Sequence, residues 1–188
     1  MADPGVRPEV SRLGSQLLHT NERSERMIEG LLVLARSDRG LPTRVPVRLD
    51  DVVRSVLRSS AALAERHDVT LQAQLRERTV AGDRTLLERL VTNLVQNAIT
   101  YNVPGGSVRL AVGGDPALVV SNSGPAVPAD LVEDLFEPFR RLVPDRTGAT
   151  GNAGLGLSIV RSVAHAHDGS ATTEPGRGGG LVVTVRLP

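Results

Sequence analysis

Three polar side chains at helical spacing are the first candidates for chemistry in this 188-residue chain. Asn93, Asn97 and Tyr101 stand four residues apart in LVTNLVQNAITYN, at positions 90–102. On a helix of about 3.6 residues per turn they share one stripe, beside an apolar face of leucine, valine and alanine. Asparagine is a poor helix former, so two on one face indicate a contact outside the helix. Taken alone they could be plain surface residues, but the glycine-rich segments downstream favour a binding role.

A fourth candidate lies at the end of a predicted strand, in VSNSGPAV at positions 120–127. Asn122 precedes a tight turn that contains Gly124, and strand ends commonly carry polar groups that contact ligands. An amide both donates and accepts, so Asn122 could read the amino edge of a purine while Gly124 lets the backbone approach the ring. The same residues are also typical of a simple hairpin turn.

A long loop follows, FEPFRRLVPDRTGATGNAGLG at positions 136–156, with arginines, glycines and little apolar patterning. Loops of this length are often lids or binding loops. The GLGL run at positions 154–157 opens a helix, whose free N–H groups and positive dipole end suit a phosphate. Arg140, Arg141 and Arg146 could add positive charge, although exposed arginines are more often solvated.

Composition narrows the class of protein. The net charge is +1, from 22 basic and 21 acidic residues, which argues against nucleic acid as a partner. The absence of cysteine excludes disulfides, thiolate nucleophiles and cysteine-type zinc sites, and the four histidines form no metal-binding motif. The longest apolar run, residues 31–35, is far too short for a bilayer span, and no signal peptide is evident.

The elements that must position these residues can be read from periodicity. An apolar 3,4 spacing from Val10 to Leu34 predicts a helix that pairs with another helix, in the same chain or in a second copy. The glycine and proline at positions 40 and 42 end it, and the domain boundary is placed there. Asp50 and Asp83 are expected to cap the helices that follow them. Downstream we expect strands at 45–49, 69–75, 107–112, 117–121, 170–173 and 181–187, and helices at 51–66, 84–102, 129–135 and 155–167.

Four motifs together carry a specific resemblance. NLVQNA, NSGP, LFEPFRR and GLGLSIV, in this order and spacing, closely resemble the N, G1, F and G2 boxes of the ATP-binding domain of sensor histidine kinases. The resemblance implies a GHKL or Bergerat fold: a two-layer α/β sandwich with a mixed sheet of about five strands and three helices on one face, preceded by an α-helical segment. Residues 1–42 resemble part of the dimerisation and histidine phosphotransfer hairpin with its linker, and residues 43–188 the ATP-binding catalytic domain.

The resemblance also implies an ATP and Mg²⁺ site. Asn97 would hold Mg²⁺ through its amide oxygen, and Asn93 and Tyr101 would contact phosphates, which suits a hard ion that prefers oxygen ligands. Asn93 and Arg141 are the expected catalytic residues. The expected nucleotide-binding set is Asn93, Asn97, Tyr101, Asn122, Gly124, Ala126, Gly154, Leu155, Gly156 and Leu157.

Four positions depart from the family pattern. Asn122 replaces the aspartate that usually reads the adenine amino group, and Ala126 replaces the second glycine of the G1 box. Thr100 stands where many members have lysine or arginine against the phosphates, and Asn152 replaces the first glycine of the G2 run. An uncharged acceptor makes a weaker hydrogen bond, so a modest ATP affinity is expected.

The residue type at position 93 distinguishes members of this fold that hydrolyse ATP from members that transfer phosphate to another group. Members that hydrolyse ATP place a glutamate general base four residues before the magnesium asparagine, where this chain has Asn93. An amide cannot take a proton from water, so transfer to an external acceptor fits better than hydrolysis. His19 lacks the acidic residue and the proline that usually follow a phosphoacceptor histidine. The histidines at positions 67, 165 and 167 lie in the wrong domain and are expected at the surface or at helix ends.

The expected function is therefore that of the catalytic fragment of a two-component sensor histidine kinase, which transfers the γ-phosphate of Mg-ATP to a histidine on a hairpin helix absent from this chain. Such a fragment would not autophosphorylate alone. Its expected partners are that helix, a response regulator receiver domain and a second copy in the full-length protein, and family habit makes it the cytoplasmic part of a membrane-anchored sensor. The alternative is a degenerate nucleotide-binding module that acts in dimerisation or regulation, and an ATPase ranks third.

Overall fold

The structure, a computed structural model, describes residues 41, 43–140 and 154–188 of the chain. The helix expected over residues 10–34, the boundary at position 42, Arg141, Arg146 and Asn152 lie outside the described residues. The elements are β1 (Val45–Arg48), α2 (Leu49–Arg66), β2 (Thr70–Leu75), β3 (Thr79–Gly82), α3 (Arg84–Thr100), β4 (Ser107–Val112), β5 (Leu118–Asn122), the 3₁₀ helices η1 (Ala129–Leu131) and η2 (Glu133–Phe136), α4 (Gly156–Ala166), β6 (Ser170–Pro175) and β7 (Leu181–Arg186).

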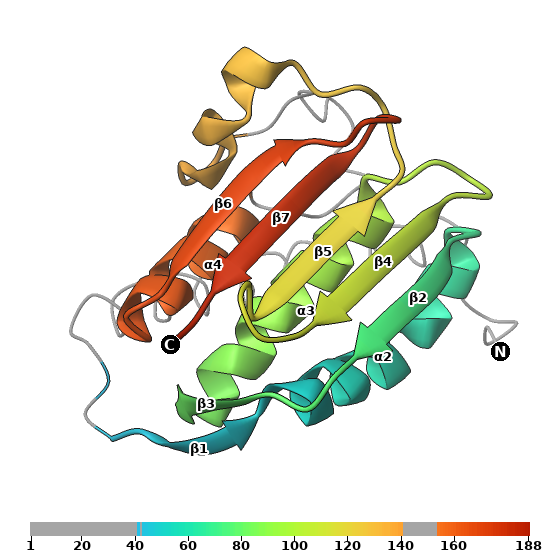
Figure 1. Ribbon diagram of the computed structural model, residues 1–188. Helices are drawn as coiled ribbons and strands as arrows, with labels where there is room; N and C mark the ends of the chain where they lie inside the picture. The colour runs from blue at the N-terminus through green and yellow to red at the C-terminus, as the bar shows by residue number, and fades with distance from the viewer. Residues whose placement is uncertain (1–40, 42, 141–153) are drawn as a thin grey trace, which may run out of the picture.

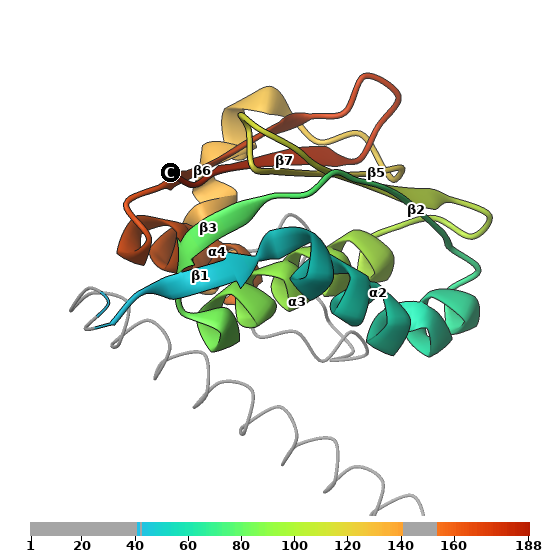
Figure 2. The same ribbon diagram turned by 60° about the horizontal axis from the view of Figure 1, so that its bottom comes forward.

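Five strands form the main sheet, in the order β2-β4-β5-β7-β6 (Figure 1). β2 and β4 are parallel and the other neighbours are antiparallel, so the sheet is mixed. Helices α2, α3 and α4 all lie on one face of it (Figure 2). On β4 this face carries the buried side chains Val108, Leu110 and Val112, which alternate with outward residues. The predicted two-layer α/β sandwich is confirmed.

A second, two-stranded sheet was not predicted. β1 pairs antiparallel with β3, with Val45 opposite Gly82 and Arg48 opposite Thr79. β3 was not among the predicted strands, because Val80 is the one large apolar residue at positions 79–82. The strand expected to reach Leu49 ends at Arg48.

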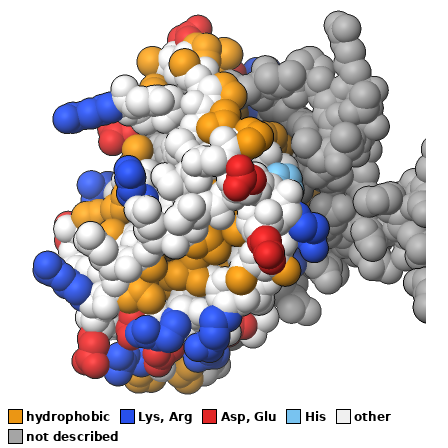
Figure 3. All heavy atoms as spheres, turned by 90° about the vertical axis from the view of Figure 1, so that its right-hand side faces the viewer, with side chains coloured by type: hydrophobic (Ala, Val, Ile, Leu, Met, Phe, Trp, Pro, Cys, Tyr) orange, Lys and Arg blue, Asp and Glu red, His pale blue; other side chains and the backbone are white. Residues whose placement is uncertain are grey.

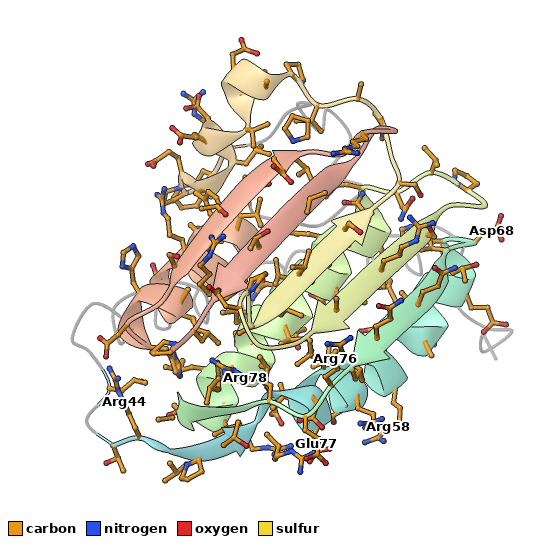
Figure 4. The ribbon with its side chains drawn as sticks, in the orientation of Figure 1. Arg44, Arg58, Asp68, Arg76, Glu77 and Arg78 are labelled. Carbon is orange, nitrogen blue, oxygen red and sulfur yellow. The ribbon has the colours of Figure 1, made fainter. Side chains whose placement is uncertain are left out.

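The prediction that Asp50 caps α2 is wrong. The helix begins at Leu49, its N-cap is Arg48, and no side chain caps it. Asp50 is instead 2% exposed and accepts two hydrogen bonds from the Arg48 guanidinium, at 3.0 Å (Nε to Oδ1) and 2.8 Å (Nη2 to Oδ2), and one from the Arg78 backbone N–H at 3.3 Å. The bonds from Arg48 lower the pKa of Asp50 to about 2. Figure 4 shows Arg78 near β3, on the connection from β2.

The helix that carries the asparagines is as expected. Asp83 caps α3, because its Oδ1 accepts from the backbone N–H groups of Thr85 (2.7 Å) and Leu86 (3.1 Å). The helix ends at Thr100, before Pro104. Its apolar face, which includes the fully buried Leu87, Leu90, Val91 and Val95, belongs to the core. The helix expected over 129–135 is instead two short 3₁₀ helices.

His167 is a helix-end residue, as expected, but it is also buried, with 1% of its surface exposed. Its Nδ1 donates to the Val163 carbonyl (2.7 Å) and its Nε2 accepts from the Asp83 backbone N–H (3.1 Å). Burial lowers the pKa of His167. A side chain at Gly82 would collide with the ring, since a Cβ there would lie 2.3 Å from its Cδ2. The histidine therefore joins the start of α3 to the end of α4.

Residues before β1 also reach the end of α4. Arg44 forms an ion pair with Asp168 and donates from Nη2 to the Ala166 carbonyl (3.2 Å; Figure 4). On the side of the molecule seen in Figure 3, basic and acidic side chains are interspersed around apolar ones. No helix among the described residues combines the length and apolar character needed to cross a bilayer.

Candidate nucleotide-binding site

A cavity of about 420 Å³ lies between α3, the end of β5, the 3₁₀ segment, the start of α4 and the β6–β7 turn. The structure brings all but one of the predicted nucleotide-binding residues to its wall. These are Asn93, Asn97, Tyr101, Asn122, Ala126, Gly154, Leu155, Gly156 and Leu157. The exception is Gly124, which is not among the residues that line the cavity. Residues that are far apart in the sequence thus converge on one cavity.

The central contact of the cavity is between α3 and α4. A Cβ at Gly156, the first residue of α4, would lie 2.6 Å from Nδ2 and 3.0 Å from Oδ1 of Asn97. Only glycine therefore lets the backbone of α4 approach the Asn97 amide this closely. One turn earlier on α3, Asn93 uses its amide N–H₂ within its own helix, donating to the Arg89 carbonyl at 2.8 Å.

Asn122 is held in one orientation by two backbone groups. Its Nδ2 donates to the Ser123 carbonyl (2.7 Å), and its Oδ1 accepts from the Leu181 backbone N–H (3.3 Å). Rotating the amide by half a turn would set donor against donor and acceptor against acceptor. Each amide atom retains a second hydrogen-bonding function, so Asn122 can offer an acceptor beside a donor. That order matches the amino group and the neighbouring ring nitrogen on the edge of adenine.

Gly124 lies close to the backbone of two segments that line the cavity. A Cβ there would lie 3.0 Å from the Tyr101 carbonyl oxygen and 3.4 Å from the Cα of Gly180. The turn after β5 thus packs on the C-terminal end of α3 and on the β6–β7 turn. The Tyr101 side chain, at the helix end, is 43% exposed.

Part of the wall was not predicted from the sequence. The β6–β7 turn contributes Gly180 and Leu181, and Gly180 adopts a positive φ of 73° with its Cα directly against the Asn122 backbone. The three glycines at positions 178–180 were the available signal in the sequence for a close backbone approach. An apolar wall suited to a flat ring is formed by Val120, Val127, Leu131, Leu135, Ile159 and Val183.

Two cationic side chains are on the described wall, Arg89 and Arg140. Arg140 forms an ion pair with Asp134 at 3.2 Å. Arg161 holds η2 against α4: its guanidinium carbon lies 5.3 Å from the centre of the Phe136 ring, and its Nη2 bonds Glu137 at 2.9 Å.

The start of α4 can receive an anion. The N-terminus of α4 lies on the cavity wall, and the N-cap residue Leu155 provides no side-chain cap. The backbone N–H groups of the first turn, which point toward this end of the helix, can therefore bind an anion in the cavity. Phe139, with a positive φ of 67°, donates its backbone N–H to the Gly154 carbonyl at 2.9 Å. The residues that flank positions 141–153 are therefore adjacent.

The donor chemistry at Asn97 fits a hard cation. No group of three His, Asp or Glu side chains suited to a metal is found in the described part of the chain. Mg²⁺ is commonly held by one or two protein oxygens together with substrate phosphates and water, so one amide oxygen on the cavity wall is a sufficient protein ligand.

Comparison with known proteins agrees with this geometry. The family described as histidine kinase-, DNA gyrase B-, and HSP90-like ATPases matches residues 82–188, and the chain belongs to this family. Within the family, it carries the catalytic ATP-binding domain of the sensor histidine kinase type.

Two curated relatives and one solved structure support that placement. Sensor protein CutS of Streptomyces coelicolor is 50% identical over 192 residues, which cover 100% of this chain and 46% of that protein. The probable sensor histidine kinase TcrY of Mycobacterium tuberculosis is 34% identical over 183 residues, covering 95% and 38%. The chain thus spans less than half the length of these relatives. The structure of the mycobacterial sensor histidine kinase MprB is similar with a TM-score of 0.66 and 28% identity, over 77% of this chain and 97% of that one.

Proposed function

We propose that this chain is the catalytic part of a two-component sensor histidine kinase, which binds Mg-ATP in the cavity and transfers its γ-phosphate to a histidine. The observation that carries the proposal is the convergence of Asn97, Asn122 and Gly156 on one cavity wall, although they come from three separate motifs. Such a cavity offers a polar side chain that can hydrogen-bond a base, an oxygen ligand for a metal and a helix N-terminus that can bind phosphate.

Each part of the nucleotide has a matching part of the wall. The adenine lies against the apolar wall with its edge on Asn122, and Gly124 and Ala126 shape the turn beside it. The phosphates run along α3 past Asn97, with the first turn of α4 at Gly156 facing them. Mg²⁺, bound through Asn97, would neutralise phosphate charge and orient the γ-phosphate.

The acceptor is a histidine rather than water. Asn93 lies on the cavity wall where a hydrolase needs a general base, and a carboxamide cannot accept a proton there. It is therefore assigned a phosphate contact through the second N–H of its amide, because the first N–H donates to the Arg89 carbonyl. The catalytic role of Arg141 rests on the family resemblance alone.

The arrangement of the whole protein is proposed on the same basis. Residues 1–42 would be a part of the dimerisation and phosphotransfer hairpin with its linker, and residues 43–188 the catalytic domain. The phosphoacceptor helix, a response regulator receiver domain and a second copy of the protein would be its partners. The domain would work in the cytoplasm as part of a membrane-anchored sensor.

The test is phosphate transfer to a supplied acceptor. The chain is mixed with an intact hairpin of its own protein, or of its close relative, that contains the phosphoacceptor histidine, and with γ-labelled ATP and Mg²⁺. We expect acid-labile label on the hairpin, lost when the acceptor histidine is replaced, and no label on the chain alone. Absence of transfer, with the nucleotide bound normally, would overturn the kinase assignment.

Nucleotide binding without phosphate transfer would support the alternative, a nucleotide-binding module that acts in dimerisation or regulation. The observation in its favour is the set of substitutions at Asn122, Ala126 and Thr100, two of which lie on the cavity wall. Release of free phosphate at a rate above transfer would instead indicate an ATPase, against the expectation from Asn93.

A further inference from the structure

Two polar side chains, Asn102 and Ser123, join the end of α3 to the turn after β5. The helix lies beside this strand (Figure 1). Asn102 directly follows Tyr101, the C-cap residue of α3. Ser123 stands between Asn122, the last residue of β5, and Gly124. The Ser123 hydroxyl donates to the Asn102 amide oxygen at 2.8 Å. Neither residue is among those that line the cavity.

The Asn102 amide is fixed in one orientation, because each of its hydrogen-bonding functions is used. Its Nδ2 donates to the carbonyls of Ala98 (3.0 Å) and Ser107 (3.1 Å). Its Oδ1 accepts from the Val103 backbone N–H (2.9 Å) as well as from the Ser123 hydroxyl. A carboxamide has two N–H donors and an oxygen with two lone pairs, so this set is complete. Asn102 thus connects the last turn of α3 to the start of β4.

Ser123 completes the connection to Asn122. Its hydroxyl accepts from the Ser107 backbone N–H at 2.8 Å, and its backbone N–H donates to the Ser107 carbonyl at 3.0 Å. Its carbonyl accepts from Asn122 Nδ2 at 2.7 Å. A Cβ at Gly106 would overlap Asn102 Oδ1 and lie 2.6 Å from Ser123 Oγ, so only glycine lets the two side chains meet. The position of the Ser123 carbonyl is therefore set from the end of α3 and the start of β4.

The orientation of the Asn122 amide decides which purine it can bind. With its Nδ2 held on the Ser123 carbonyl, its oxygen can accept from the 6-amino group of adenine and its second N–H can donate to the neighbouring ring nitrogen. In a 6-oxopurine the group at position 6 is an acceptor and the neighbouring ring nitrogen is a donor. The held amide would set like groups against such a base, whereas an amide turned by half a turn would match it.

We propose that Asn102 and Ser123 are positioning residues, which hold the Asn122 amide in the orientation that binds adenine and rejects 6-oxopurines. The inference rests on the proposed function, since it requires a purine nucleotide in the cavity. Both residues act through the Ser123 carbonyl rather than by touching the nucleotide. Without the hydroxyl, the turn after β5 keeps its backbone hydrogen bond to Ser107 but loses its tie to α3, so the Asn122 amide can turn over.

The test is calorimetric titration with Mg-ATP and with Mg-ITP. Inosine triphosphate has the same ribose and phosphates as ATP, and its base differs only by the oxygen at position 6 and the proton on the neighbouring nitrogen. We expect the wild-type chain to prefer ATP by at least about tenfold, since like groups in contact leave both unsatisfied. In Ser123→Ala this preference should fall by about threefold to tenfold, the range of one neutral hydrogen bond. ITP affinity should be unchanged or higher, which also shows that the variant is folded.

Three further variants sharpen the result. Ser123→Thr keeps the hydroxyl and should retain the preference for ATP. Ser59→Ala is the matched control, because it removes a hydroxyl that bonds the Val56 carbonyl at 3.0 Å on α2, outside the cavity wall, and it should leave the preference unchanged. Asn102→Ala should lower the preference at least as far as Ser123→Ala does. Combining these two changes should lower it little further, because both residues act through one contact.

Four results would overturn the proposal. An equal loss of ATP and ITP affinity in Ser123→Ala would give the pair a structural role only, and an unchanged preference would show that it does not orient Asn122. A wild-type chain that binds ATP and ITP equally would overturn the inference while the proposed function stands. A wild-type chain that binds neither nucleotide would overturn both.

Discussion

Replacing Gly156 with alanine should weaken the binding of Mg-ATP without lowering the stability of the fold. The new Cβ would lie 2.6 Å from Asn97 Nδ2, whereas ordinary contacts begin at 3.4 Å, so the amide must move by about 0.8 Å. The atom displaced is the end of a side chain on the open cavity wall, so the fold can accommodate the change. Gly156 opens α4 with a φ outside the left-handed region, and alanine there gains up to roughly 1 kcal/mol of helix propensity.

The affinity for Mg-ATP, in contrast to the stability of the fold, should fall in Gly156→Ala. Mg²⁺ requires near-ideal octahedral geometry with oxygen ligands at about 2.0–2.1 Å, and a misplacement of about 1 Å in a functional site can reduce its function by about 100-fold. We expect Gly156→Ala to weaken Mg-ATP binding by tenfold to about 100-fold. The melting temperature should be unchanged or higher.

The assay is calorimetric titration with ATP in the presence of Mg²⁺ and again in the presence of a chelator, together with thermal unfolding. Gly114→Ala is the matched control, because a Cβ at Gly114 meets no atom within 4 Å. It should bind as the wild-type chain does. If Gly156→Ala binds ATP with wild-type affinity and the same dependence on Mg²⁺, the position of the Asn97 amide against the start of α4 does not matter for metal binding, and the reasoning is refuted.

Three other substitutions test the supports of the site. Asp83→Ala removes the cap of α3 and should lower the free energy of unfolding by about 1 kcal/mol in urea titrations. The buried His167 has a lowered pKa in the folded state, so the unfolded chain binds its proton first as the pH falls. Stability should therefore decrease below about pH 6.5, by at most about 1.4 kcal/mol per pH unit from this group, and His167→Gln should reduce that slope. Asn122→Asp sets a carboxylate oxygen against the Ser123 carbonyl in place of a 2.7 Å hydrogen bond and should lower the free energy of unfolding by about 1–2 kcal/mol; an equally stable variant would show that this bond does not orient the amide.

The features that could be predicted from the sequence are those set by neighbouring residues. Asp83 caps α3 through N–H groups two and three positions on, and a turn at Gly113 and Gly114 joins β4 to β5. The stripe of Asn93, Asn97 and Tyr101 follows from helical periodicity and meets the cavity as expected. The family resemblance then related motifs that no local pattern connects.

The features that were missed depend on distant contacts. Asp50 has the residue type and position of a cap, but Arg48 and the backbone of Arg78, 28 residues later, bind its carboxylate instead. β3 forms because β1 pairs with it, not because its four residues are strongly strand-like. His167 is buried because Asp83, 84 residues away, supplies a partner for its ring.

In the candidate site, too, the sequence predicts the features that neighbouring residues determine and misses those that depend on distant contacts. Asn122 was identified from its place at a strand end, but its orientation depends on the Leu181 N–H, 59 residues later. The role of Gly180 on the cavity wall depends on the packing of β5 against β7. Arg89, which also lines the cavity, was not predicted from the sequence, because an arginine on a helix is usually a solvated surface residue.

Titration of the chain with Mg-ATP, in parallel with Asn97→Ala, tests the central claim most directly. We predict saturable binding with one nucleotide per chain, weakened when Mg²⁺ is chelated, and little further effect of Mg²⁺ once Asn97 is alanine. No binding to the wild-type chain at millimolar nucleotide, or undiminished magnesium-dependent binding to Asn97→Ala, would contradict the account.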